Sequence, residues 1–155
     1  MRKIAICTNF YFELSDTAFL KLAEKKGVTL YPERHDPYYV LYWTVPEDQW
    51  QNCPSYNEDR EGHKIAVEYE RAHNWDYIAH SLSRDDKDLI SVIEELGSDV
   101  ASRYDSNLRI VEIPDDVDYE IEMHSEFGGE WVVEKHRSWR YDSREPNGTK
   151  ERPKK

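Results

Sequence analysis

The chain is poor in cysteine, which excludes two kinds of stabilising framework. Cys7 and Cys53 are the only two thiols among 155 residues, too few for the disulfide network of a small secreted scaffold. They do not form a Cys-x-x-Cys motif, so their spacing predicts no thiolate metal site. No histidine is recognisable from the sequence as the partner of either thiol, so we expect no thiol nucleophile.

Long apolar runs are absent as well. No window approaches the roughly 20 apolar residues that a membrane-spanning helix needs. The apolar start of the chain is interrupted by Thr8, Asn9 and Glu13, unlike the continuous core of a signal peptide. We therefore expect a cytosolic protein without a membrane partner.

Positive charge is in short supply: 21 Lys and Arg face 32 Asp and Glu, which gives a formal net charge of −11. A field of this sign repels phosphate backbones, so we expect no direct binding of nucleic acid. It favours basic partners, or mimicry of an acidic polymer. A local basic pocket is still compatible with it, because net charge does not describe any one site.

Phosphate-binding and catalytic motifs are missing too. There is no GxGxxG, P-loop, HExxH or Gly-x-Ser-x-Gly motif. Asp115 and Asp116 follow a predicted strand and a proline, as nuclease metal ligands often do, but a solvated turn is favoured. His73 and His80 would share one face of a helix, where surface histidines are favoured over metal ligands. We assign no catalytic residue, no metal and no cofactor.

Local patterns predict two well-defined helices. Ser15 as N-cap, the apolar residues after it and Gly27 at the end predict a helix over 16–26. A start resembling a capping box at Ser83, followed by apolar residues at helical spacing, predicts a second helix over 85–96. Residues 63–80 favour a helix over a strand, though both patterns fit. The segment 46–62 is expected to be a polar loop.

Strands are expected at 3–7, 28–31, 38–45, 108–113, 119–123 and 131–136. The last two should form a hairpin that turns at Gly128-Gly129. In that hairpin Tyr119, Ile121 and Met123 should face the core, and Glu120 and Glu122 should face solvent. The sequence therefore predicts one α+β domain over 1–140, with two or three helices packed on one face of an antiparallel-rich mixed sheet. The polar residues 141–155 should form a tail.

Three stretches resemble a family of small, largely uncharacterised accessory proteins encoded by tailed bacteriophages. They are the opening KIAI with Leu14-Ser15, the run LISVIEELG at 89–97, and the region 108–139 with LRIVEIPDDV, YEI and EKHRSW. The resemblance covers about half of the chain, chiefly 84–139. Relatives tend to carry two glycines between the first strand and the first helix, where this chain has NFYFE at 9–13. A glycine-rich loop there could cradle a phosphate, so its loss removes support for a ligand at that end.

One group of basic and aromatic residues could hold a nucleotide. Guanidinium groups bind phosphate and an indole stacks on a base. The group comprises Arg84, Arg109, His136, Arg137 and Trp139. The favoured alternative is that Trp139 covers the edge of the core while the basic side chains pair with the acidic surplus.

The resemblance implies a phage protein in the host cytoplasm that binds a host component without catalysis. The leading hypothesis is counter-defence by sequestration of a nucleotide-type immune signal, which needs a pocket with arginine and aromatic side chains. An acidic DNA mimic or an inhibitor of a host protein is an alternative, and a metal-dependent hydrolase that uses Asp115 and Asp116 is another. The sequence leaves the ligand and homo-oligomerisation open.

Overall fold

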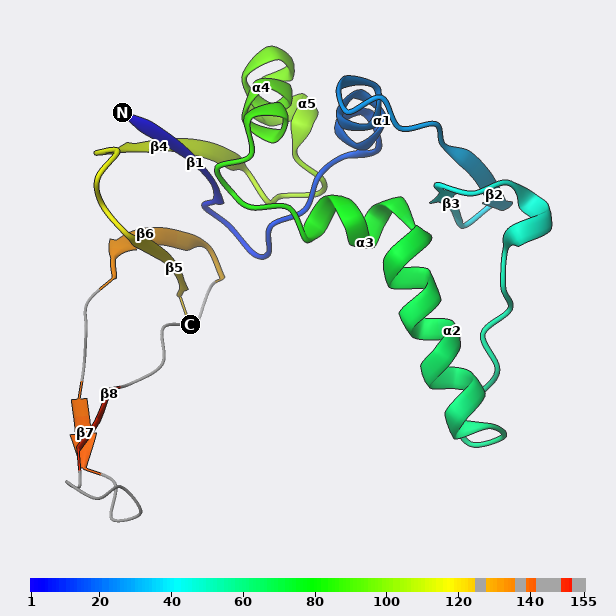
Figure 1. Cartoon of the computed structure of the whole chain (residues 1–155). Helices are drawn as coiled ribbons and strands as arrows, with labels where there is room; N and C mark the ends of the chain where they lie inside the picture. The colour runs from blue at the N-terminus through cyan, green and yellow to red at the C-terminus, as the bar shows by residue number, and fades with distance from the viewer. Residues whose placement is uncertain (125–127, 136–138, 142–148, 152–155) are drawn as a thin grey trace.

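The structure is a computed structural model that describes residues 1–124, 128–135, 139–141 and 149–151. Its described helices are α1 (Asp16–Lys25), the 3-10 helix η1 (Glu47–Gln49), α2 (Arg60–His73), α3 (Trp75–His80), α4 (Lys87–Leu96) and α5 (Ser98–Ala101). Its described strands are β1 (Arg2–Cys7), β2 (Tyr31–His35), β3 (Tyr39–Trp43), β4 (Leu108–Ile113), β5 (Tyr119–Met123), β6 (Glu130–Glu134), β7 (Trp139–Tyr141) and β8 (Thr149–Glu151). The α+β class is confirmed (Figure 1).

The strands pair as four antiparallel two-stranded ladders, β1–β4, β2–β3, β5–β6 and β7–β8. The antiparallel pairing is confirmed, but the described strands do not join into the single mixed sheet that we expected. The free edge of β1 explains part of this difference. There the Ala5 N–H donates to the backbone carbonyl of Arg84 at 2.8 Å, and the Cys7 N–H donates to the side chain of Glu130 at 3.0 Å. A loop and a side chain therefore take the bonds that a third strand would have made.

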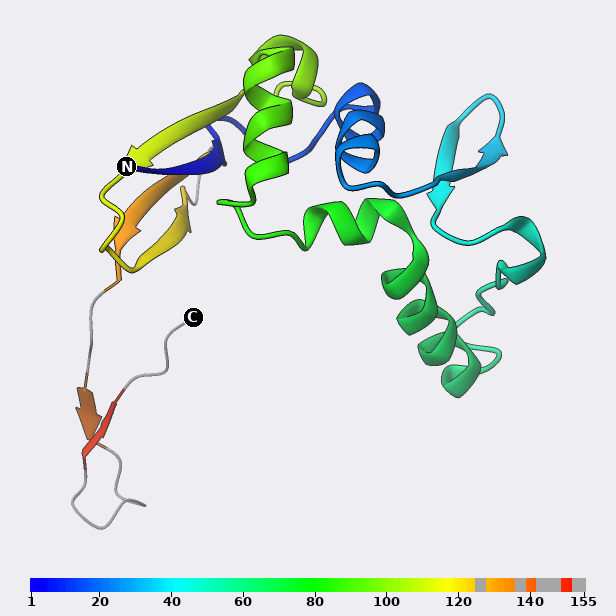
Figure 2. The same ribbon diagram turned by 45° about the horizontal axis from the view of Figure 1, so that its top comes forward.

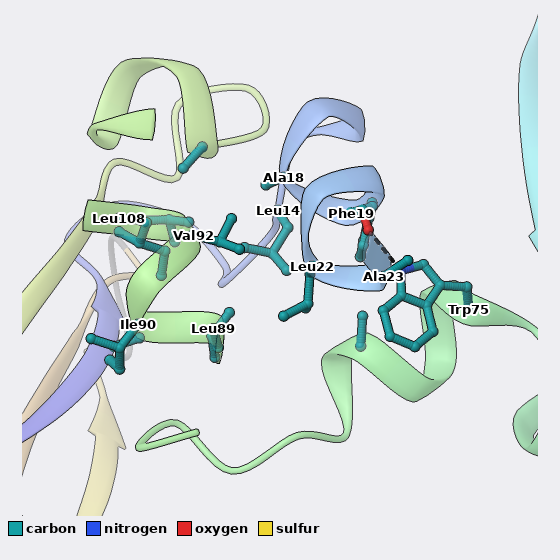
Figure 3. Packing of buried hydrophobic residues seen from close by; sticks show 14 of the residues in the cluster. Leu14, Ala18, Phe19, Leu22, Ala23, Trp75, Leu89, Ile90, Val92 and Leu108 are labelled. Carbon is teal, nitrogen blue, oxygen red and sulfur yellow. Dashed lines mark hydrogen bonds between the residues drawn. The ribbon is translucent and has the colours of Figure 1, made fainter. Parts of the chain in front are cut away.

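The main core lies where α4 packs against β1 and β4 on one side and against α1 on the other, with α3 beside α1 (Figure 2). Residues Ile4 to Cys7 of β1 are all buried, which matches the continuous apolar run in the sequence rather than an alternating pattern. Apolar side chains from all these elements form one cluster (Figure 3). Among the described residues, no helix is long and apolar enough to cross a membrane.

The two predicted helices are confirmed, and their caps differ in how well they were predicted. Ser15 caps α1 by accepting a hydrogen bond from the Ala18 N–H, as expected. Helix α4 begins two residues later than predicted because Asp86, not Ser83, is the cap. The Asp86 carboxylate accepts from the N–H groups of Asp88 and Leu89, each at 3.0 Å. These two bonds satisfy two of the N–H groups that the start of a helix leaves open.

The ambiguous segment 63–80 is helical, but it forms two helices rather than one. Asn74 ends α2 and caps α3, its side chain accepting from the Asp76 N–H at 3.0 Å. It is buried, and its backbone forms an isolated bridge with Trp43. The break also separates His73 on α2 from His80 on α3, so the shared helical face that we expected for these histidines is not formed.

The strand predicted at 28–31 is wrong. The Val28 N–H donates to the Ala23 carbonyl and so completes the end of α1, which removes this residue from any ladder. The strand β2 instead spans Tyr31–His35, largely between the strands expected at 28–31 and 38–45, and pairs with β3 from Tyr31↔Trp43 to His35↔Tyr39.

The β5–β6 hairpin pairs as predicted, with Ile121 opposite Val132. Glu122 is exposed, as expected, but Glu120 is half-buried and Met123 is 48% exposed. These two expectations were wrong because no residue of β5 is fully buried, so neither face of the strand forms part of the core. The predicted boundary at residue 140 falls within β7, which pairs with β8 in the segment that we expected to form a tail.

Candidate ligand-binding site

The structure does not gather the five predicted site residues into one described site. Arg84 precedes α4 and lies at the edge of β1, whereas Arg109 is exposed on β4 opposite Ile6. His136 and Arg137 lie outside the described residues. Only the strand position of Trp139 is described.

The Arg84 side chain makes its contacts with other groups of the protein. Its Nη1 and Nη2 atoms donate to the two carboxylate oxygens of Glu130 at 2.7 and 3.0 Å, and Nη1 also lies 3.2 Å from the Ala5 carbonyl oxygen. The guanidinium carbon stands 3.6 Å from the centre of the Phe12 ring. These contacts engage both terminal nitrogens of the guanidinium, the pair that would bind a phosphate bidentately, so we assign Arg84 a structural role.

Glu130 completes this arrangement from β6. Its side chain is only 5% exposed, and it accepts from Arg84 and from the Cys7 N–H. Burial by itself would raise the pKa of Glu130, but these hydrogen bonds outweigh it and hold the pKa below its ordinary value. The pair therefore links β1, β6 and the segment before α4 through charge-assisted bonds.

A cavity of about 200 Å³ lies between α1, α3, β3 and the segment after α5. Its lining residues are Asp16, Phe19, Tyr39, Val40, Leu41, Tyr42, Trp75, Asp76 and Arg103. Four of these nine are aromatic, so the cavity offers several rings on which a planar group could stack.

The α1–α3 side of the cavity is held rigidly. Trp75 is 2% exposed, and its indole N–H donates to the Phe19 carbonyl at 2.9 Å (Figure 3). A buried indole whose single donor is satisfied has little freedom to turn. Trp75 also begins α3 directly after the buried cap Asn74, so the backbone at this wall is fixed as well.

The β3 side is anchored through the end of the strand. Trp43 is 2% exposed and donates from its indole to Glu33 on β2 at 2.7 Å. The next residue, Thr44, donates its backbone N–H to the carbonyl of His73 at 2.8 Å. These bonds tie β3 to the α2–α3 junction, so Tyr39 and Tyr42 are presented from a fixed strand.

Three charged side chains line the cavity, and Arg103 is the basic one. Its backbone N–H donates to the Glu13 carbonyl at 3.1 Å, and its guanidinium carbon lies 5.4 Å from the centre of the Tyr104 ring. Within the described part of the chain, no carboxylate lies within the 4.0 Å of an ion pair with Arg103. The guanidinium therefore has no close ion-pair partner there and can contact an anionic group of a ligand.

The two acidic groups are Asp16 and Asp76. A hydrogen bond from His80 lowers the pKa of Asp76, burial opposes this effect, and the charge of Arg103 adds to the lowering. Asp76 is therefore ionised at neutral pH and can only accept hydrogen bonds. Together the rings, the guanidinium and the carboxylates suit a planar molecule that carries both N–H or O–H donors and an anionic group.

Sequence reasoning did not identify this site. The aromatic strand was recognised at 38–45, but nothing local showed that it would meet Trp75 and Arg103. Neither residue stands in a motif, so the only sequence signal was the clustering of tyrosines in that strand.

The other predicted candidates lie apart from the cavity. Asp115 pairs with the N-terminal ammonium group at 3.1 Å, and Asp116 is exposed. In the ranges that the structure describes, no group of three or more His, Cys, Asp or Glu side chains is placed to hold a metal ion. One expectation about the thiols is corrected: Cys53 Sγ lies 3.4 Å from Nδ1 of His63. The ten-residue spacing of this pair belongs to no motif that we recognised.

Comparisons of the chain with models of protein families, with characterised proteins and with solved structures found no match. The resemblance to phage accessory proteins therefore stays a prediction. The functional interpretation therefore rests on the cavity and on the contacts of its lining residues.

Proposed function

We propose that this protein is a non-enzymatic phage accessory protein that sequesters a small nucleotide-type molecule of the host. The observation that supports this proposal is the occurrence of Arg103 in the same cavity as Phe19, Tyr39, Tyr42 and Trp75. An arginine beside aromatic rings supplies the two contacts that a nucleotide requires, one for its phosphate and one for its base.

The size of the cavity indicates which part of the ligand enters. A volume of about 200 Å³ is below the roughly 300–1,000 Å³ of sites that enclose a whole drug-sized ligand. We therefore place the base inside, between the rings, and the sugar and phosphate toward the mouth. Stacking of one base on an aromatic side chain contributes about 1–3 kcal/mol.

The acidic side chains restrict the ligand further. Asp16 and Asp76 can accept hydrogen bonds from an exocyclic amino group or a ribose hydroxyl. They also repel additional phosphates, as does the net charge of −11. The proposed ligand is thus a nucleotide of low charge, such as a nucleoside monophosphate or a cyclic nucleotide, rather than a triphosphate.

A thermal-shift screen against mono-, di-, tri- and cyclic nucleotides tests the proposal. Because a ligand that binds only the folded state stabilises it, a nucleotide of low charge should raise the Tm of the native protein. The rise should be smaller in Arg103→Gln and unchanged in Arg109→Gln, the matched control with an exposed arginine on β4.

Two results would count against the proposal. One is a Tm that no nucleotide raises, which would favour the alternatives of an inhibitor of a host protein or an acidic DNA mimic. The other is a rise of equal size in Arg103→Gln and in the native protein, which would place the nucleotide outside the cavity.

A further inference from the structure

Cys53 and His63 meet at the start of α2, and neither residue lines the ligand cavity. Cys53 is exposed in the loop between η1 and α2, and His63 lies in the first turns of that helix. The Sγ and Nδ1 atoms are 3.4 Å apart. An accessible sulfur therefore has a polar ring atom within hydrogen-bonding distance.

The position of the hydrogen on His63 follows from a second contact. Nδ1 lies 2.8 Å from the carbonyl oxygen of Pro54, and a carbonyl oxygen can only accept. Nδ1 must therefore carry the hydrogen. The Cys53 sulfur lies 3.4 Å from the same nitrogen, so this N–H can also be shared with a negative charge that develops on the sulfur.

The Tyr56 ring and the capped helix turn hold the imidazole in this orientation. The Tyr56 ring packs edge-on against His63, with ring centres 5.7 Å apart, and the guanidinium carbon of Arg60 stands 5.2 Å from the centre of the Tyr56 ring. Asp59 caps the helix through the Gly62 N–H at 2.9 Å, which fixes the turn that carries His63.

The second thiol provides an internal contrast. Cys7 is buried, and burial, followed by the negative charge of Glu130, raises the pKa of its thiol to about 12. Reaction requires the thiolate and access to it. Cys7 should therefore be inert in the folded protein, whereas Cys53 has both access and a hydrogen-bond donor.

We propose that Cys53 is a thiol–disulfide exchange site for low-molecular-weight disulfides, and that the Nδ1–H of His63 supports its thiolate. In this step Cys53 releases its proton to solvent and its sulfur attacks one sulfur of the disulfide. A new S–S bond forms at Cys53 as the original S–S bond breaks, and its electron pair leaves with the other sulfur, which takes up a proton. The small disulfide is reduced and Cys53 is oxidised to a mixed disulfide.

The test follows the reaction of the native protein with dithiodipyridine, a neutral chromogenic disulfide that the acidic surface does not repel. One thiol should react in the folded protein and the other only after unfolding. Cys53→Ser should abolish the first phase and Cys7→Ala should leave it in place. Oxidised mercaptoethanol should add one adduct, located on Cys53 by peptide mass spectrometry and removed by dithiothreitol.

Substitutions of His63 show whether the reactivity of Cys53 depends on the hydrogen bond or only on the exposure of the thiol. His63→Leu removes the donor and should slow the Cys53 phase by about twofold to tenfold, as expected for one hydrogen bond. His63→Asn places an amide N–H near the position of Nδ1 and should restore most of the rate. Circular dichroism would establish that each variant is folded. Equal rates in the native, Leu and Asn forms, or a fast phase that survives Cys53→Ser, would overturn the proposal.

Discussion

Arg84 and Glu130 form a doubly hydrogen-bonded ion pair at the edge of β1 that β4 leaves free. The two bonds measure 2.7 and 3.0 Å, and the side chains are 22% and 5% exposed. Both residues also bond to the backbone of β1, through the Ala5 carbonyl and the Cys7 N–H. This pair holds β6 and the segment before α4 against β1.

Replacing Arg84 with alanine should lower the free energy of unfolding by about 3 kcal/mol, because removing one partner of a buried pair leaves an uncompensated charge. Urea unfolding followed by circular dichroism would measure it. Arg109→Ala, an exposed arginine on β4, is the matched control and should change stability by less than about 0.5 kcal/mol. Equal midpoints for the two variants would show that the ion pair has no structural role.

The same pair makes stability depend on pH. Since the folded-state pKa of Glu130 is held below its ordinary value of 4.5, the unfolded chain binds this proton more readily than the folded one. The contribution of Glu130 is therefore complete above about pH 4.5 and is lost as the pH falls toward its folded pKa.

Urea midpoints measured over a series of acidic pH values would test this dependence. Glu130→Gln should be less stable than the native protein at neutral pH but should lose stability less steeply below about pH 4.5. Glu112→Gln, an exposed carboxylate on β4, provides the control and should keep the native slope. A Glu130→Gln curve parallel to the native one would contradict the assignment.

Local signals predicted the helices better than the strand arrangement. Ser15 and the apolar spacing after it define α1 within a few residues, so the helix could be read from a short window. The edge of β1 is different, because Arg84 and Ala5 are 79 positions apart in the chain. No local pattern shows that a loop will take the bonds of a neighbouring strand, so a single sheet was predicted.

The ligand cavity was missed for the same physical reason. Phe19, Tyr42, Trp75 and Arg103 come from four segments, and only packing brings them together. The sequence predicted that a nucleotide site would contain basic and aromatic side chains. It placed Arg84 in that site, but Arg84 forms an ion pair with Glu130. Whether His136, Arg137 and Trp139 contribute stays a prediction.

Gly128 should tolerate a side chain less well than Gly27. Both have positive φ, +67° and +68°, so alanine at either position carries the strain of a left-handed residue, about 1–2 kcal/mol. At Gly27 no atom of the described residues beyond its chain neighbours lies within 4 Å of the added Cβ, but at Gly128 that Cβ would stand 2.5 Å from the backbone of Phe10.

Thermal unfolding would separate the two effects. The Tm of Gly27→Ala should fall by the amount that the backbone strain requires, and that of Gly128→Ala should fall further because Phe10 must move as well. Equal Tm values for these variants would mean that the close approach between Gly128 and Phe10 is absent in solution.

The most direct test of the proposed function is a calorimetric titration of the native protein, Arg103→Gln and Arg109→Gln with nucleotides of low charge. A hydrogen bond to a charged group contributes about 1.5–3 kcal/mol, so Arg103→Gln should raise the Kd by about tenfold to a hundredfold. Arg109→Gln should leave it unchanged. Native affinity in Arg103→Gln, or no heat of binding with any nucleotide, would contradict a nucleotide site in the cavity between α1, α3 and β3.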